Sequence, residues 1–233
     1  VGRLLHAAVL GRKSIVIAGD QGAGKTTLLR ALIASIPENE RFGTLETDYE
    51  LLTHLQPGRR NIVALQARVG MGEVADGRQV GEFTVAQLIP EALRQNLSRL
   101  IVGEVRGAEA GAMFEAMQSG AGTLSTTHSH SADSTIDRLA ARVAQGGVLT
   151  VAEAYRQIAH HVALIVHVRL QDDTWRGGVR TRAISEVVAL TGALEGDRPV
   201  THHVYDADGD GSLSAETRLR EGLAPFWSDW RAR

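Results

Sequence analysis

The stretch SIVIAGDQGAGKTTLLRALIASI, residues 14–36, decides the fold of this chain. Ser14 to Ala18 is a short β-branched run that predicts a buried strand. Gly19 to Thr26 matches G-x-x-x-x-G-K-[ST] at every fixed position. Thr26 to Ile36 predicts a helix that ends before Pro37. A strand, a glycine-rich loop and a helix in this order favour a phosphate-binding loop over a glycine-rich turn with a coincidental lysine.

The residue types of this loop suit a nucleoside triphosphate. Glycines let backbone N–H groups approach a phosphate closely, and the start of the helix adds its positive dipole end. Lys25 can reach the β- and γ-phosphates, and the hydroxyl of Thr26 can coordinate Mg²⁺. The predicted nucleotide-binding residues are Gly19, Asp20, Gln21, Gly22, Ala23, Gly24, Lys25, Thr26 and Thr27.

Beyond this unit, short apolar strands alternate with helices. Such alternation predicts an α/β fold of parallel βαβ units with helices on both faces of the sheet, and the last two long strands predict an antiparallel edge. A first short helix is expected around residues 4–9, and residues 69–83 are expected to form a loop. Expected strands are 42–46, 62–66, 100–103, 123–126, 162–170, 179–190 and 201–205, and expected helices are 84–96, 108–118, 134–143 and 151–160.

Composition excludes several classes of protein. The 233 residues contain no cysteine, which removes disulfide frameworks, thiolate zinc sites, iron–sulfur clusters and cysteine nucleophiles. With 25 basic and 27 acidic residues the net charge is -2, so there is no overall positive field for gripping nucleic acid. No apolar run approaches the ~18 residues of a membrane span. The chain starts at Val1 with no signal-peptide pattern, and we expect a fragment that lacks an N-terminal domain.

Two further predicted strands end in glutamates. Residues 100–103 lead directly into Glu104, where the second acidic strand of a phosphate-loop enzyme positions Mg²⁺ or the attacking water. Gly103 occupies the place of the usual aspartate, so Glu104 must act alone or with a helper. Glu46, at the end of 42–46, is the candidate helper. The alternative for each is a solvated carboxylate at a strand end or turn.

A third predicted strand, 123–126, leads into Thr127 and His128 at the same sheet edge. A neutral histidine there can donate a hydrogen bond to a γ-phosphate and respond to its loss. The alternative is a surface or helix-capping histidine.

Four sequence boxes now stand in order: GDQGAGKTT (19–27), TLETDYEL (44–51), RLIVGEVRG (99–107) and GAGTLSTTHSHSADSTIDRL (120–139). Together they resemble the secretion and traffic ATPases, which power type II and type IV secretion and type IV or Flp pilus machines. The resemblance covers about residues 1–190 and points to the CpaF-like branch of Flp/Tad pili. A glycine before the catalytic glutamate is usual in this family.

The resemblance implies a RecA-like ATPase domain, which we place over residues 1–195, and the residues of the tail predict a C-terminal hairpin and aromatic helix packed on it over 196–233. It implies ATP with Mg²⁺, a homo-oligomer that is a hexamer in the full-length protein, and an inner-membrane platform protein reached from the cytoplasmic side. No direct nucleic-acid partner is expected. The implied function is an ATP-hydrolysing motor of a secretion or pilus machine. The alternatives are a nucleotide-dependent switch or scaffold and a DNA-transfer ATPase.

Individual residues match functional positions of that family. The catalytic positions so matched are Lys25, Glu46, Glu104, Arg106 and His128, and the Mg²⁺ positions are Thr26, Glu46 and Glu104. Glu50 matches the second outer glutamate of the acidic box, whereas Thr47 stands where the family usually has an aspartate and Asp48 comes one position later. Candidates for an arginine that acts across a subunit interface are Arg59, Arg60, Arg68 and Arg94.

The C-terminal tail carries two weaker signals. Asp206 to Gly211 looks like the start of a calcium loop, but the acid that such a loop needs at position 12 falls on Thr217, so we expect a hairpin turn. Gly222 to Arg233 predicts a short helix with an aromatic face.

Overall fold

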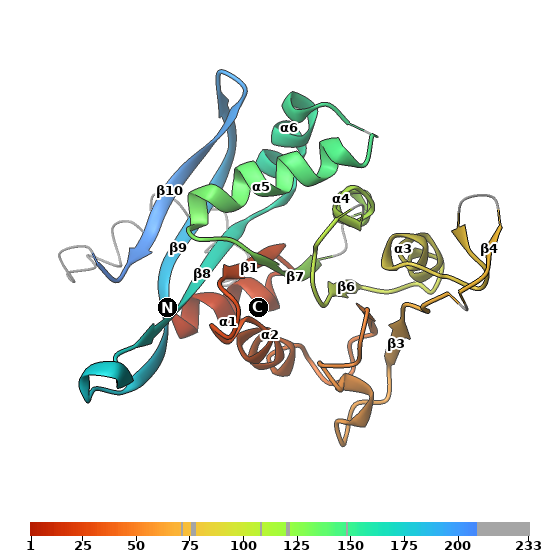
Figure 1. Cartoon of the computed structure of the whole chain (residues 1–233), viewed down its shortest axis with the longest axis horizontal. Helices are drawn as coiled ribbons and strands as arrows, with labels where there is room; N and C mark the ends of the chain where they lie inside the picture. Colours follow the sequence, from red (N-terminus) through yellow and green to blue (C-terminus); the bar gives the residue numbers. More distant parts are fainter. Residues whose placement is uncertain (71, 76–77, 108, 120–121, 148, 209–233) are drawn as a thin grey trace.

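The computed structural model describes residues 1–70, 72–75, 78–107, 109–119, 122–147 and 149–208. Within these residues the molecule is built on an eight-stranded sheet with the order β10-β9-β8-β1-β7-β6-β2-β3 (Figure 1). The strands are β1 (Ile15–Gly19), β2 (Phe42–Glu46), β3 (Ile62–Gln66), β6 (Arg99–Val102), β7 (Gly122–His128), β8 (Leu164–Asp172), β9 (Arg180–Glu195) and β10 (Arg198–Asp206). Neighbours from β8 to β3 pair in parallel, and β9 and β10 pair antiparallel at one edge. The expected α/β architecture is confirmed.

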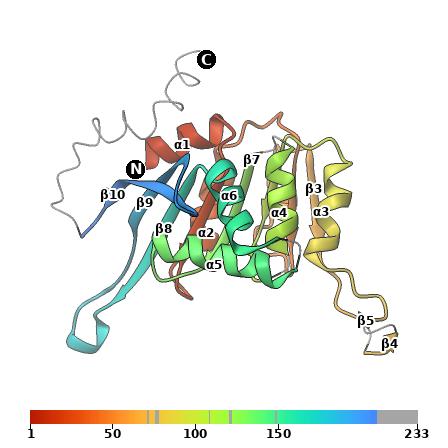
Figure 2. The same cartoon turned by 90° about the horizontal axis from the view of Figure 1, so that it is seen from above.

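Helices cover both faces of the sheet, as Figure 2 shows. One face carries α1 (Gly2–Leu10) and α2 (Lys25–Ala34), and the other carries α3 (Val85–Leu93), α4 (Glu109–Gln118), α5 (Ala132–Gln145) and α6 (Val151–His161). Strand β1 separates the two halves of the core. Ile15 and Ile17 pack with α1 and α2, whereas Val16 and Ala18 pack with the helices of the opposite face. Because successive side chains of a strand point to opposite faces, a strand covered on both sides is apolar at every position.

The parallel strands determine where the polar residues meet. Gly19 at the end of β1 pairs with His128 at the end of β7. The next two strands follow in the same direction, with Ser125 of β7 beside Val102 of β6, and Val102 beside Leu45 of β2. The phosphate loop and the residues after β6, β7 and β2 therefore gather at one edge, which is the usual ligand-binding edge of an α/β sheet.

The segment 69–83 differs from the expected loop. It contains a two-stranded hairpin, β4 (Val74–Ala75) with β5 (Arg78–Gln79), and Arg68 and Phe83 form an isolated antiparallel bridge at its base. The hairpin projects from the body of the molecule beside α3 (Figure 2). Each of these strands is only two residues long and is defined by its backbone pairing. The sequence therefore shows no alternation of polar and apolar side chains that would predict them.

Strand β10 pairs along β9 and so continues the sheet to Asp206. Arg169 of β8 holds the end of this strand, because its Nη2 donates to Oδ1 of Asp208 at 2.8 Å. The turn expected over Asp206–Gly211 lies partly, and the helix expected over Gly222–Arg233 lies entirely, outside the described residues. None of the helices in the described ranges has the length and apolar character that crossing a bilayer requires.

Candidate nucleotide-binding site

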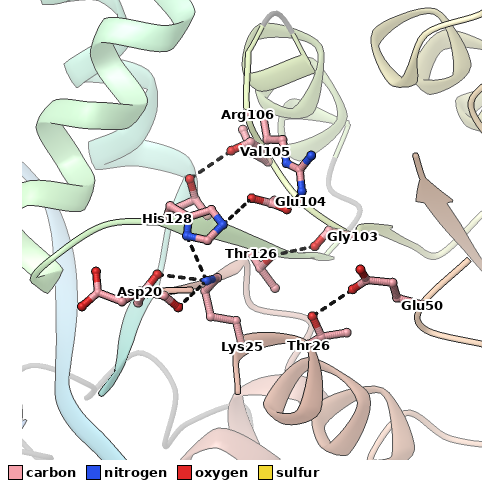
Figure 3. A network of polar contacts seen from close by, with 12 residues as sticks. Asp20, Lys25, Thr26, Glu50, Gly103, Glu104, Val105, Arg106, Thr126 and His128 are labelled. Carbon is pink, nitrogen blue, oxygen red and sulfur yellow. Dashed lines mark hydrogen bonds and ion pairs between the residues drawn. The ribbon is translucent and has the colours of Figure 1, made fainter. Parts of the chain in front are cut away.

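A cleft of about 610 Å³ lies at the carboxyl edge of the parallel strands, and Figure 3 shows the polar network in it. Its lining residues are Gln21, Gly22, Gly24, Lys25, Thr26, Thr27, Glu46, Thr47, Asp48, Glu50, Gly103, Glu104, Arg106, Thr126, His128 and Arg182. The cleft thus brings together all the side chains that the sequence assigned to catalysis and Mg²⁺ binding. Three predicted loop residues do not line it. Gly19 ends β1, Ala23 is buried in the core, and Asp20 is exposed and lies 3.0 Å from Nδ1 of His130 through its Oδ1.

Lys25 is the first residue of α2, and only 8% of it is exposed. Its ammonium folds back over the loop and donates to the carbonyl oxygens of Gly19 at 2.9 Å and Asp20 at 2.8 Å. The loop can turn so tightly because Gly22 (φ 74°) and Gly24 (φ 98°) adopt left-handed conformations. Burial lowers the pKa of Lys25, and nearby carboxylates offset part of that effect.

His128 connects Lys25 to Glu104. Its Nδ1 lies 3.2 Å from Nζ of Lys25, and because an ammonium has no lone pair, Nδ1 must be the acceptor. The ring hydrogen of the neutral imidazole then sits on Nε2, which lies 3.0 Å from Oε1 of Glu104. Burial, and next the charge of Lys25, lower the pKa of His128, which favours this neutral form. The backbone of His128 is held as well, since its carbonyl oxygen accepts from Arg138 at 2.9 Å.

The two oxygens of Glu104 have different surroundings: Oε2 is hydrogen-bonded, whereas Oε1 is buried without a hydrogen-bond partner among the described residues, although it lies 3.0 Å from Nε2 of His128. Oε2 accepts from Nη2 of Arg106 at 2.6 Å (Figure 3). Burial by itself would raise the pKa of Glu104, but the hydrogen bond and charge of Arg106, together with His128 and Lys25, lower it overall. The carboxylate is therefore ionised at neutral pH and able to orient or deprotonate a water molecule.

Glu46 lines the same cleft as Glu104 and is almost fully buried, with 3% exposed. Its Oε1 accepts from the backbone N–H groups of Glu50 at 2.9 Å and Leu51 at 2.8 Å. Its buried Oε2 has no hydrogen-bond partner among the described residues, and burial raises the pKa of Glu46. Gly103 makes this packing possible, because a Cβ at that position would lie 3.0 Å from Cγ of Glu46. The buried glutamate thus explains why a glycine stands where other phosphate-loop enzymes carry an aspartate.

The residues present fit a magnesium ion. The hydroxyl of Thr26 donates to Oε2 of Glu50 at 3.2 Å, which leaves the lone pairs of its oxygen for a cation. Glu46 lines the cleft, and its buried Oε2 is a second acceptor that has no hydrogen-bond partner among the described residues. Hydroxyl and carboxylate oxygens are the ligands that Mg²⁺ prefers, directly or through bound water. Asp48 lines the cleft as well, and it is exposed.

The arginines considered for action across an interface lie outside the cleft. Arg59 donates to the carbonyl oxygens at the end of α2, at 3.0 Å for Ile33 and 2.9 Å for Ile36, so within this chain it caps that helix. Arg94 lies 3.8 Å from Glu91. Arg68 pairs through its backbone at the base of the β4–β5 hairpin, and Arg60 is exposed.

Two arginines of the site were not predicted from the sequence. Arg142 of α5 donates to the carbonyl oxygen of Val105 and to the hydroxyl of Thr127, and so ties together the segments that carry Glu104 and His128. Arg182 of β9 donates from Nε to the carbonyl oxygen of Gly22 at 2.8 Å. The contacts of Arg142 with Val105 and of Arg182 with Gly22 span 37 and 160 positions of the chain, and the strand order brings these partners together.

The sequence of the chain matches a known protein family and several of its relatives. The profile of the family "Type II/IV secretion system protein" matches residues 2–188. A protein of Mycobacterium tuberculosis named for conjugal transfer is 34% identical over 206 residues, which are 88% of this chain and 53% of that protein. The type IV secretion system protein PtlH of Bordetella pertussis is 38% identical over 136 residues, which are 58% of this chain and 38% of that protein.

Solved structures agree in fold. The crystal structure of the VirB11 ATPase from the Brucella suis type IV secretion system, in complex with sulphate, is 32% identical and superimposes with a TM-score of 0.65 over 80% of this chain and 51% of that one. The ATPase DotB of Legionella pneumophila is 20% identical, with a TM-score of 0.55 over 100% of this chain and 55% of that one, and supports the fold alone. The chain thus spans about half the length of several of the relatives it matches.

Proposed function

Because the chain belongs to the type II/IV secretion system protein family, we propose that it is the ATP-hydrolysing motor domain of a bacterial secretion or pilus-assembly machine. The observation that carries this proposal is the continuous polar network from Lys25 through His128 to Glu104 and Arg106, set at the end of a complete phosphate loop. Such a network can both hold a γ-phosphate and act on the water that attacks it.

The proposed chemistry is positioning combined with electrostatic stabilisation. The loop backbone and Lys25 would bind the phosphates, and Thr26 with Glu46 and Glu104 would hold Mg²⁺. When bound, the ion neutralises charge on the β- and γ-phosphate oxygens. Glu104 orients or deprotonates the attacking water. His128 contacts both Lys25 and Glu104. A movement of the phosphate bound by Lys25 can therefore be transmitted through the His128 side chain to Glu104, the proposed general base.

The remaining assignments are proposals that follow from the family. We propose that residues 1–195 form the RecA-like ATPase domain and that 196–233 form a C-terminal appendage. The full-length protein would assemble as a homohexamer on an inner-membrane platform protein at the cytoplasmic face. We assign it to the CpaF-like branch of Flp/Tad pili because of the four boxes in the sequence.

Two observations support alternative functions. The relative named for conjugal transfer favours a DNA-transfer machine as the assembly that this motor drives. The pairing of Glu104 with Arg106, whose Nη2 donates to Oε2 at 2.6 Å, engages the carboxylate and favours a nucleotide-dependent switch that turns over slowly. A motor can be distinguished from a switch by the rate of phosphate release at saturating MgATP. This rate is measured with and without a partner protein that stimulates hydrolysis.

The decisive experiment compares the chain with its Lys25→Ala variant by calorimetric titration of MgATP. The variant should lose measurable binding, because the loop loses the cation that faces the β- and γ-phosphates. Lys13→Ala, at the chain's other lysine, is the matched control and should bind normally. Equal affinity for Lys25→Ala and the unchanged chain would overturn the assignment of the site.

A further inference from the structure

Strand β9 contacts the phosphate-loop side of the cleft and the start of α5, although its residues belong to none of the four sequence boxes. On one side, Arg182 holds the carbonyl oxygen of Gly22 in the phosphate loop at 2.8 Å. On the other side, Oε2 of Glu186 accepts from the backbone N–H of Ala132, at the start of α5, at 2.9 Å. The two contacts anchor β9 to the loops that follow β1 and β7.

A buried histidine strengthens the second anchor. His167 of β8 lies with Nδ1 2.6 Å from Oγ of Ser185 in β9, and its Nε2 lies 3.2 Å from the carbonyl oxygen of Ser129. Because a carbonyl oxygen only accepts, Nε2 carries the hydrogen and Nδ1 accepts from the serine hydroxyl. His167 and Ser185 are both at most 4% exposed, so this connection is dry and fixed. It sets the position of β9 three residues beyond Arg182.

The side chain of Arg182 runs along the outside of the phosphate loop. A Cβ placed on Gly24 would lie 3.4 Å from Cδ of Arg182, so the arginine stem occupies the side of Gly24 toward which a side chain would project. The hydrogen bond to Gly22 then fixes the plane of the peptide between residues 22 and 23, since that unit is rigid. The direction of the next N–H group in the loop depends on this plane.

Arg182 also changes the charge of the cleft. Among the described residues that line it, Lys25, Arg106 and Arg182 carry positive charge, against the carboxylates of Glu46, Asp48, Glu50 and Glu104. Arg106 is already paired with Glu104. A nucleotide that carries several negative charges therefore enters a cleft in which the carboxylates outnumber the cations, and the loss of one cation weakens its binding.

We propose that Arg182 is a positioning residue of the nucleotide site, which acts from within the same chain: it holds the phosphate loop in shape through Gly22 and presents its remaining guanidinium donors to the phosphates of a bound nucleoside di- or triphosphate. This proposal rests on the proposed function. The guanidinium uses Nε for the loop, and its terminal groups are the donors that Arg offers to phosphate oxygens.

The test is calorimetric titration of MgADP and MgATP into the chain and three variants. Arg182→Ala should bind both nucleotides about tenfold more weakly, the scale of a lost charge-assisted contact. Arg182→Lys keeps the positive charge but loses the planar, forked set of guanidinium donors. It should therefore bind nucleotide more tightly than Arg182→Ala, a partial recovery that a general loss of folding would not allow. Arg180→Ala is the matched control, because Arg180 lies two positions away on the same strand and donates to Asp172 at 2.8 Å instead.

The outcomes are separable. If the unchanged chain binds neither nucleotide, the proposed function fails and the role of Arg182 falls with it. If the unchanged chain binds and Arg182→Ala binds equally well, the role of Arg182 alone is wrong. Equal losses in Arg182→Ala and Arg182→Lys, with lowered thermal stability in both, would also overturn it, because the arginine would then only support the fold.

Discussion

His128 and Lys25 lie 103 positions apart in the chain, yet Nδ1 of the histidine lies 3.2 Å from Nζ of the lysine. The contact follows from the pairing of β7 with β1, which sets Gly19 beside His128 at the sheet edge. An ammonium at this distance tolerates only the neutral imidazole, because protonation would bring two cations into contact. The contact therefore links the protonation state of His128 to the stability of the site.

Mild acid should destabilise the folded chain through His128. Its pKa is lowered from the ordinary 6.5 in the folded state, by burial and next by Lys25. The unfolded chain then binds the proton first as the pH falls, so the contribution of the neutral ring is complete above about pH 6.5 and is lost below it. Thermal unfolding between about pH 7.5 and pH 5.5 should show a falling Tm.

Two variants isolate this effect. His128→Gln keeps an acceptor for Lys25 but cannot titrate, so its Tm should fall less steeply over the same pH range. His6→Gln changes an exposed residue of α1 and should keep the slope of the unchanged chain. Parallel curves for all three proteins would contradict the assignment.

Binding and hydrolysis should separate at Glu104. Glu104→Gln keeps the shape of the side chain and removes the carboxylate that we propose as the general base. MgATP should still bind, while turnover should fall ~10²-fold or more, the scale of a lost general base. Phosphate release under saturating MgATP measures the loss. Glu115→Gln, at an exposed glutamate of α4, is the matched control and should turn over normally. Normal hydrolysis by Glu104→Gln would instead point to Glu46.

We expect that replacing Gly103 even by alanine lowers the stability of the chain. The added Cβ would lie 3.0 Å from Cγ of Glu46, whose carboxylate is fixed by two backbone N–H groups and cannot easily move. We expect Gly103→Ala to destabilise the chain by about 1 kcal/mol, at the low end for an overpacked core. Gly111→Ala, in α4, meets nothing within 4 Å and should instead stabilise by about 0.5 kcal/mol. Chemical denaturation measures both, and equal stability of the two variants would show that the glycine is not required by Glu46.

Local signals explain why so much of the site could be predicted. The loop 19–26 is one contiguous motif, Glu46 and His128 each end a strand and Glu104 follows one closely, so their shared sheet edge follows from the βαβ order alone. Arg182 and Arg142 gave no such signal, because an arginine in an exposed strand or a helix is ordinary and its partner lies far away in the chain. The small β4–β5 hairpin was missed for a related reason, since its two-residue strands are paired by backbone alone.

We expect turnover to depend on assembly, because the resemblance to the family implies that a neighbouring subunit supplies a cation to each site. Among the described residues, the one guanidinium bound to Glu104 is that of Arg106, and this pairing engages its charge. A cation that neutralises transition-state charge in phosphoryl transfer contributes ~10³-fold or more in rate. We therefore expect the 233-residue chain to bind MgATP but hydrolyse it slowly at low concentration, and a chain with the full length of its relatives to gain activity per subunit steeply as concentration rises.

The measurement is phosphate release per subunit against protein concentration, with the mass of the assembly determined in parallel by light scattering. Arg59→Ala and Arg60→Ala, tested in the longer chain, would identify the acting residue if one of them removes the concentration dependence while leaving nucleotide affinity unchanged. A chain that is fully active while strictly monomeric at high dilution would defeat the shared-site mechanism and leave the phosphate-loop chemistry intact.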